Sequence, residues 1–215
     1  MAAPAGVTPH HLHTPVRVNR VWHIDLLSLE ILWFRFTVAA ILDGFFRRLL
    51  SLRVYRRTPQ ARDMVALVRR ICKESGKPRF IITDHGTQFR RQFRSAMRKM
   101  GIQPVQARVR AAYLNGKIER AFQTFRVWWR LVLTGLTQGD IQRRLDVFEN
   151  WFNEHRPHSA LHGLTPREAW EGHGPAERIP IRARDSARRH IEVSRGNCQG
   201  DPRSPVIEIS VQLAA

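Results

Sequence analysis

FIITDHGTQF, residues 80–89, is the stretch that decides the fold of this chain. Its first four residues form an apolar run typical of a buried strand, and the run stops at Asp84, which His85 and Gly86 follow. Asp and Gly are common in the turns that end strands, so an ordinary loop is one explanation. The other is that the strand carries Asp84 to a shared site, which requires partners elsewhere in the chain.

The segments on either side of this strand predict an α/β domain. Upstream, three β-rich segments with turn-sized breaks predict an antiparallel meander, and apolar residues at helical spacing then predict a helix. Downstream, the pattern predicts a helix, a short strand and two further helices. The segments are residues 20–31, 32–44, 47–56 and 61–75 upstream, and 89–100, 102–108, 115–133 and 140–154 downstream. This order is RNase H-like, with a mixed β-sheet and flanking helices.

Three regions follow from the composition along the chain. Residues 1–19 lack apolar periodicity and are expected to form a flexible N-terminal arm, and residues 20–172 are expected to form the RNase H-like core. Residues 173–215 are basic and contain two alternating runs, residues 189–194 and 205–213. These runs predict a small C-terminal β-rich appendage built on a hairpin.

The charge balance points to a polyanionic partner. The 215 residues include 36 Lys and Arg against 18 Asp and Glu, a formal charge of +18, while the hydrophobic content of 43% is normal for a folded protein. An Arg-rich solvated surface is the alternative. Two cysteines without metal-ligand spacing and no signal-peptide pattern indicate a reducing cytosol. The longest apolar run, residues 31–46, is interrupted by charges and is too short to cross a membrane.

Three carboxylates take particular places in the predicted order. Asp25 follows the apolar start of the first strand, Asp84 ends the fourth, and Glu119 lies early in the helix predicted over residues 115–133. The first and fourth strands are neighbours in an RNase H-like sheet. Residues 85–118 are enough for one helix, one strand and a turn. We therefore expect the three carboxylates to converge.

Such a cluster predicts a divalent metal site. Like charges repel one another unless protons or cations compensate them, and oxygen-only ligands select hard ions, Mg²⁺ or Mn²⁺. In two-metal phosphoryl chemistry, one ion activates the attacking oxygen and the other stabilises the leaving oxygen. We expect Asp25, Asp84 and Glu119 to be catalytic and to hold two ions. Each also has a simpler explanation; Glu119, for instance, could form a solvated ion pair with Arg120.

Four blocks together resemble the DDE integrase catalytic core of bacterial insertion-sequence transposases and retroviral-type integrases. They are VWHID, ITDHGTQF, LNGKIERAFQTFR and WFNEHRPHSALHGLTPREAW, and the likeness covers residues 20–170. By this resemblance, Asp25, Asp84 and Glu119 match the metal-binding triad of the family. Gly86 matches the glycine after the second aspartate, where a backbone without Cβ permits a tight turn.

The resemblance also implies contacts with DNA. Asn115 and Gly116 match the turn before the catalytic helix, and Arg120 matches the basic residue after its glutamate. The residues expected to bind nucleic acid are Asn115, Lys117, Arg120, Arg126 and Arg156.

The last block, residues 153–170, has two explanations. His155, Arg156 and His158 contact phosphates in one of them; in the other, which we favour, the block is a structural clasp that closes the core. Within it, Thr165 is predicted to cap a short helix that starts at Pro166.

The leading hypothesis is a DDE transposase or integrase that cleaves DNA and transfers strands, acting as a homo-multimer on element ends and target DNA in the bacterial cytoplasm. Only residues 1–24 precede Asp25, too few for the helix-turn-helix region usual in such transposases, so we expect that region to be separate or missing. A DNA-binding fragment or regulator without productive catalysis is the second hypothesis. An RNase H-like nuclease without strand transfer is the third.

Overall fold

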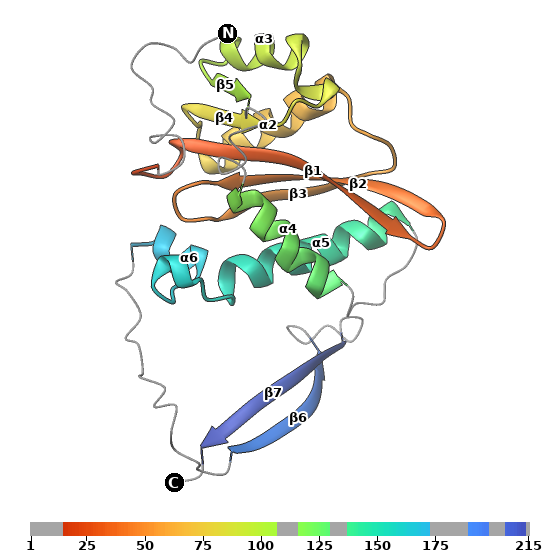
Figure 1. Cartoon of the computed structure of the whole chain (residues 1–215), viewed down its shortest axis with the longest axis vertical. Coiled ribbons are helices and arrows are strands. Elements are labelled where there is room, and N and C mark those ends of the chain that lie inside the picture. Colours follow the sequence, from red (N-terminus) through yellow and green to blue (C-terminus); the bar gives the residue numbers. More distant parts are fainter. Residues whose placement is uncertain (1–14, 107–115, 130–136, 173–188, 198–204, 214–215) are drawn as a thin grey trace. The chain divides into compact units, whose positions relative to one another are not determined.

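A five-stranded mixed sheet forms the centre of the core, in the order β3-β2-β1-β4-β5 (Figure 1). The antiparallel strands are β1 (Val21–Ile31), β2 (Phe34–Asp43) and β3 (Leu49–Tyr55). The parallel strands β4 (Phe80–Thr83) and β5 (Gln103–Gln106) continue the sheet from β1. The computed structural model describes residues 15–106, 116–129, 137–172, 189–197 and 205–213.

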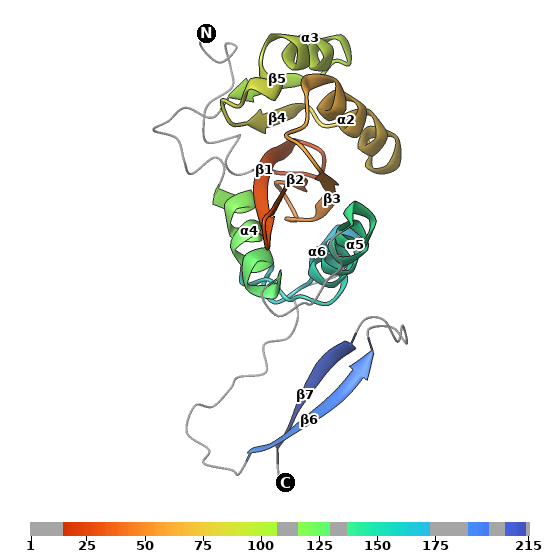
Figure 2. The same ribbon diagram turned by 90° about the vertical axis from the view of Figure 1, so that its right-hand side faces the viewer.

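Two hydrophobic clusters, one on each face of the sheet, hold the helices in place. Helices α2 (Ala61–Ser75) and α3 (Arg91–Lys99) pack on one face, and α4 (Gly116–Trp129) and α5 (Gln138–Glu154) pack on the other (Figures 1 and 2). Along β2, Val38 and Ala40 belong to the α4–α5 side, whereas Ala39 and Ile41 belong to the α2–α3 side. Because side chains alternate across a strand, the continuous apolar run of β2 buries both of its faces.

The outer edge of β3 is bonded by side chains of α5 instead of another strand. Asn153 accepts from Leu49 N at 2.9 Å and donates to Leu49 O at 2.8 Å. Glu149 accepts from Leu52 N at 2.9 Å, and Gln142 accepts from Val54 N at 3.0 Å. Polar groups of a helix thus satisfy backbone groups that an edge strand would otherwise expose.

The fold class is confirmed, and its elements differ from expectation mainly at their ends. The helix over residues 61–75 has the bounds that the sequence predicts. Phe89, expected in the next helix, lies instead in a 3₁₀ turn, Thr87–Phe89, that precedes α3. The predicted ends of the helix over residues 115–133 lie outside the described residues.

Asn19, at the end of the predicted arm, is bonded to three parts of the core. Its backbone N–H donates to Asp43 Oδ2 at 2.9 Å, its side-chain amide donates to Ser75 O at 2.7 Å, and its Oδ1 accepts from the indole of Trp22 at 3.0 Å. Residues 1–14 of the arm lie outside the described residues.

The chain divides into two compact units, Met1–Ala176 and Glu177–Ala215. The second contains one antiparallel pair, β6 (Arg189–Asn197) and β7 (Pro205–Leu213), which is the hairpin expected from the two alternating runs. Across the residues that the structure describes, no helix combines the length and the apolar character that a membrane crossing requires.

Candidate active site

The first two carboxylates lie at corresponding positions on neighbouring parallel strands. The pairing of β1 with β4 ends at Ile24 opposite Thr83, and the next residue on each strand is Asp25 and Asp84. Neighbouring strands lie about 4.8 Å apart, so the two carboxylates start from adjacent points of the sheet. The pairing of the strands thus brings the backbones of Asp25 and Asp84 next to each other, and a shared site remains a prediction.

Helix α4 carries Glu119, the third predicted carboxylate, within electrostatic range of Asp25. Its core face carries Ile118, Ala121 and Phe122, which are buried against the sheet, and α4 contacts β1. Glu119 follows Ile118 and is therefore turned away from that core face; it lies exposed in the first turn of the helix. Its charge acts on Asp25, which shows that α4 brings it toward the first strand.

The electrostatics of Asp25 reflect this crowding. Burial raises the pKa of Asp25 to about 6, a hydrogen bond from Leu26 N partly opposes the rise, and the charges of Asp84 and Glu119 add to it. The Leu26 bond is 2.8 Å long and ends on Asp25 Oδ1. A neighbouring cation would favour the charged form, because it offsets both the desolvation and the like charges.

The donor set of the three carboxylates fits hard divalent ions. Asp84 Oδ1 accepts from Gly86 N at 3.0 Å, and within the part of the chain that the structure describes no hydrogen bond reaches the Oδ2 atoms of Asp25 and Asp84. These oxygens are the type of ligand that Mg²⁺ and Mn²⁺ prefer. In the same residues, no three His, Cys, Asp or Glu side chains are gathered as a preassembled metal-binding group.

Gly86 lies in the turn after Asp84, but a strained backbone is not what favours glycine there. Its φ of −53° is open to any residue. A Cβ at this position would stand 2.1 Å from Nε2 of Gln88, whose side chain is buried. The expected turn is present, and the reason for glycine is the close approach of Gln88. At Gly116, the first residue of α4, a Cβ would meet nothing within 4 Å.

Lys117 is engaged with the fold rather than extended into solvent. Its Nζ donates to Gly44 O at 2.7 Å. Burial and the charge of Arg47 lower the pKa of Lys117 to about 8, while the charge of Asp43 opposes this shift. Lys117 therefore ties α4 to the turn after β2, and a contact with nucleic acid remains a prediction.

The other described residues predicted to bind nucleic acid lie on α4 and after α5. Arg120 and Arg126 are exposed on α4, and Asn115 lies outside the described residues. The guanidinium of Arg156 lies 5.5 Å from the ring centre of Phe152 and 3.1 Å from Nε2 of His158. A role of these positions in DNA binding remains a prediction.

The block after α5 has the features of the structural clasp. His158 is buried, and burial together with the charges of Arg156 and Arg47 lowers its pKa to about 4, so its ring is neutral at pH 7. Thr165 caps α6 (Pro166–Trp170) by accepting from Glu168 N at 3.2 Å, as the sequence predicts. The neighbouring His155 is exposed at the end of α5.

Sequence comparison identifies the family of the core. Two family profiles, both described as integrase core domain, match residues 15–112 and 100–166 and together span more than half of the chain. The chain belongs to the integrase core family. The resemblance inferred from the four sequence blocks is therefore confirmed. A comparison with curated proteins gave no match.

Solved structures share the fold of this integrase core. The HTLV-2 integrase catalytic core domain, in complex with magnesium and in a dimeric form, is 14% identical with a TM-score of 0.52, over 70% of this chain and 95% of that one. An intasome structure from simian T-cell lymphotropic virus is 15% identical with a TM-score of 0.59, over 94% of this chain and 72% of that one. The BIV integrase core is 14% identical with a TM-score of 0.52, over 71% and 94%. At these identities the likeness shows a shared fold.

The sequence analysis missed a group of basic residues beside Asp84. His85 and the arginines of α3 line an open pocket. The signal that could have revealed it is the spacing of Arg90, Arg94 and Arg98, which repeats every four residues and so follows one side of a helix.

Proposed function

We propose that this integrase core is a DDE polynucleotidyl transferase that cleaves DNA and joins the freed end to a target strand. The observation that carries the proposal is the placement of Asp25 and Asp84 directly after the last paired residues of two parallel strands, with Glu119 close enough to act on the Asp25 carboxylate. Catalytic carboxylates need this proximity because they share ions.

The reaction consists of two displacements at phosphorus. In the first, water attacks a phosphodiester at the end of the element, a P–O bond to water forms, and the P–O3′ bond breaks to release a 3′-hydroxyl. In the second, that hydroxyl attacks a phosphodiester of target DNA, so one P–O bond forms as another breaks. In each step the attacking group, first water and then the 3′-hydroxyl, loses a proton, and the leaving 3′-oxygen gains one. Neither an oxidant nor a reductant is therefore needed.

Asp25, Asp84 and Glu119 are the residues that would hold two Mg²⁺ or Mn²⁺ ions. When bound, such ions activate the attacking oxygen and stabilise the charge on the leaving one. The contribution of the protein is positional: the β1–β4 pairing fixes the two aspartates, and the buried face of α4 fixes Glu119. No Ser, Cys or Tyr nucleophile is then required.

The names of similar structures support the partners included in this proposal. The HTLV-2 core is described with magnesium in dimeric and trimeric forms, and the simian virus protein is described in an intasome. For this chain we accordingly propose divalent metal, DNA and self-association on DNA. Action within a bacterial insertion sequence, in the cytoplasm and on nucleoid DNA, belongs to the same proposal.

The test is metal-dependent nicking of a labelled element-end duplex by the wild-type protein and by Glu119→Gln. The variant keeps the size of the side chain but removes its charge, so nicking in Mg²⁺ or Mn²⁺ is expected to fall to background while DNA binding in chelator persists. The matched control is Glu74→Gln, which removes an exposed helical glutamate that pairs with Arg70. Its nicking is expected to equal that of the wild type.

Two results would favour the other functions. Tight DNA binding by the wild type without nicking in either metal would indicate a binding protein or regulator. Metal-dependent cleavage of RNA–DNA hybrids without joining of DNA strands would indicate an RNase H-like nuclease. Near-wild-type nicking by Glu119→Gln would reject the triad.

A further inference from the structure

Helix α3 presents arginines beside the candidate active site. They line an open pocket of about 570 Å³ between α3, β5 and the turn after β4. We call this feature the arginine pocket and define it by its lining residues: His85, Arg90, Arg91, Arg94, Ser95, Arg98 and Gln106. His85 is the neighbour of Asp84 in sequence, so the pocket opens next to the second carboxylate of the triad.

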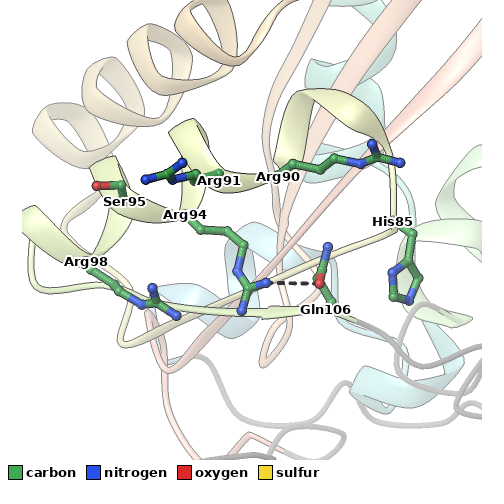
Figure 3. A pocket seen from close by; sticks show the side chains of 7 residues that line it. All are labelled: His85, Arg90, Arg91, Arg94, Ser95, Arg98 and Gln106. Carbon is green, nitrogen blue, oxygen red and sulfur yellow. Dashed lines mark hydrogen bonds between the residues drawn. The ribbon is translucent and has the colours of Figure 1, made fainter. Parts of the chain in front are cut away.

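The buried face of α3 fixes the direction of these arginines. Phe93 and Met97 are fully buried in the cluster that α3 shares with α2 and the sheet. The arginines must therefore point away from that cluster. Figure 3 shows the guanidinium groups of Arg94 and Arg98 directed toward β5, while that of Arg90 extends toward the side where His85 lies.

The pocket concentrates positive charge without an acidic partner. None of its lining residues is Asp or Glu. Among the described residues, no ion pair within 4.0 Å involves Arg90, Arg91, Arg94 or Arg98, although arginines of other elements do form such pairs. Since guanidinium groups stay charged at all physiological pH values, their mutual repulsion persists unless an anion enters.

Arg94 carries an unused donor inside the pocket. One of its terminal nitrogens donates to Gln106 Oε1 at 3.2 Å (Figure 3). Its Nε is buried and has no hydrogen-bond partner among the described residues. A buried donor left unpaired is unfavourable, and a phosphate oxygen approaching the guanidinium would satisfy it.

The start of α3 strengthens the case for an anion. The first turn of α3 contains no acidic residue; instead Arg90 is its N-cap residue and Arg91 its first residue. Cations at a helix N-terminus are unfavourable because that end of the helix dipole is positive, whereas an anion is favoured there. A bound phosphate would offset this cost while meeting the arginines.

The dimensions suit a nucleic-acid strand. From Arg90 to Arg98, α3 rises about 12 Å, at about 1.5 Å per residue. Measured along the axis of a duplex, one strand carries a phosphate about every 3.4 Å, so an α3 parallel to that axis spans three or four phosphates. The pocket is open rather than enclosed, as a continuous polyanion requires, and its lining includes His85, the residue after Asp84.

We propose that the arginine pocket binds the phosphate backbone of substrate DNA and holds that strand next to Asp84. DNA is chosen over RNA because the inference rests on the DNA-cleaving function proposed above. Arg94 and Arg98 are the main contacts, since both point toward β5, and Arg90 lies at the end nearest the carboxylates. None of these arginines belongs to the triad.

The experiment is a salt titration of DNA binding in chelator, so that it does not depend on catalysis. Each lost phosphate contact lowers the slope of log affinity against log salt by about 0.9. For Arg94→Gln/Arg98→Gln the slope is expected to fall by about 1.8, so that between about 50 and 200 mM salt the wild type loses about 12-fold more affinity than the variant. The control is Arg53→Gln, which removes one exposed charge from β3 at the opposite edge of the sheet. Its slope is expected to stay at the wild-type value.

Further variants separate contact from folding. Arg94→Lys keeps the positive charge. Its slope of log affinity against log salt is therefore expected to lie within about 0.3 of the wild-type value, because the slope counts the cations near phosphates. Arg98→Gln alone changes an exposed residue and serves as the test if Arg94→Gln unfolds. The proposal is overturned if Arg98→Gln leaves the slope at the level of the Arg53→Gln control, or if the slope changes appear with duplex RNA and not with DNA. Failure of Glu119→Gln to abolish nicking would overturn only the catalytic proposal.

Discussion

Asp25 and Asp84 occupy the same level of two hydrogen-bonded parallel strands, each one residue past the final pair of Ile24 and Thr83. Burial is the largest reason why the pKa of Asp25 reaches about 6, and the charge of Asp84 adds to the rise. The electrostatic coupling of the two aspartates can therefore be measured on the metal-free protein, independently of any reaction.

Replacement of Asp84 by Asn should lower the pKa of Asp25 toward its ordinary range, because one like charge is removed while burial persists. A carboxyl ¹³C NMR titration of the metal-free protein measures this shift. The control, Asp146→Asn, removes an exposed carboxylate on α5 and should leave Asp25 unchanged. An unaltered Asp25 titration in Asp84→Asn would show that the two side chains do not face each other.

Replacement of Gly86 by Ala should destabilise the protein by about 1–3 kcal/mol, the usual cost of forcing extra atoms into a packed site. The new Cβ would collide with the Gln88 amide, which lies 2.1 Å away. Denaturant unfolding measures the loss. Gln88→Ala removes the obstacle, so the double variant should be more stable than the sum of the two single effects predicts. Strict additivity would exclude the collision.

Replacement of Asn153 by Ala should strongly destabilise the contact between α5 and the edge strand β3. It removes the bonds to both Leu49 N and Leu49 O in a buried setting, for a loss of about 2–5 kcal/mol. Gln138→Ala is the matched comparison, since Gln138 donates one bond to Val54 O and is only half-buried. Equal losses in chemical denaturation would show that the Asn153 bonds do not support the edge strand.

Glu149 should make stability depend on pH. Burial raises its pKa from 4.5 to about 7, with the bond from Leu52 N opposing the shift. Between these values the folded state keeps a proton that the unfolded state releases. The contribution of Glu149 to stability is therefore complete below about pH 4.5 and is lost as the pH rises through 7.

The corresponding variant is Glu149→Gln, which keeps an acceptor for Leu52 N without a titrating group. Unfolding free energies measured from pH 4.5 to 8 should fall less steeply in this variant than in the wild type. Parallel pH profiles for the two proteins would refute the assignment. Glu154→Gln, at the end of the same helix, controls for a general loss of charge on α5.

The sequence predicts the order of the elements because each carries its own periodicity. Strand β4 begins with the apolar residues Phe80, Ile81 and Ile82, and α2 repeats buried residues at helical spacing, so both are recognisable without tertiary information. The placement of Asp25 beside Asp84 then follows from the sheet order of the fold. The RNase H-like order predicts that these two strands are neighbours, whereas their register appears only in the structure.

Other features of the core depend on contacts between distant parts of the chain, which the sequence pattern does not reveal. Asn153 and Glu149 look like surface residues of an amphipathic helix, and only the docking of α5 against β3 turns them into partners of the backbone. The arginines of α3 likewise match an ordinary solvated face until β5 closes one side of the pocket. Lys117, predicted to meet DNA, is drawn to Gly44 by the way α4 crosses the sheet.

The covering of β3 by α5 also limits how two copies of this core can associate. A strand whose N–H and C=O groups are already bonded to helix side chains cannot recruit another strand, so the sheet cannot be extended into a neighbouring molecule at Leu49, Leu52 and Val54. The self-association proposed above would then use side-chain packing or the other end of the sheet. The β3 edge is therefore protected from aggregation by strand addition, which an unpaired edge strand permits.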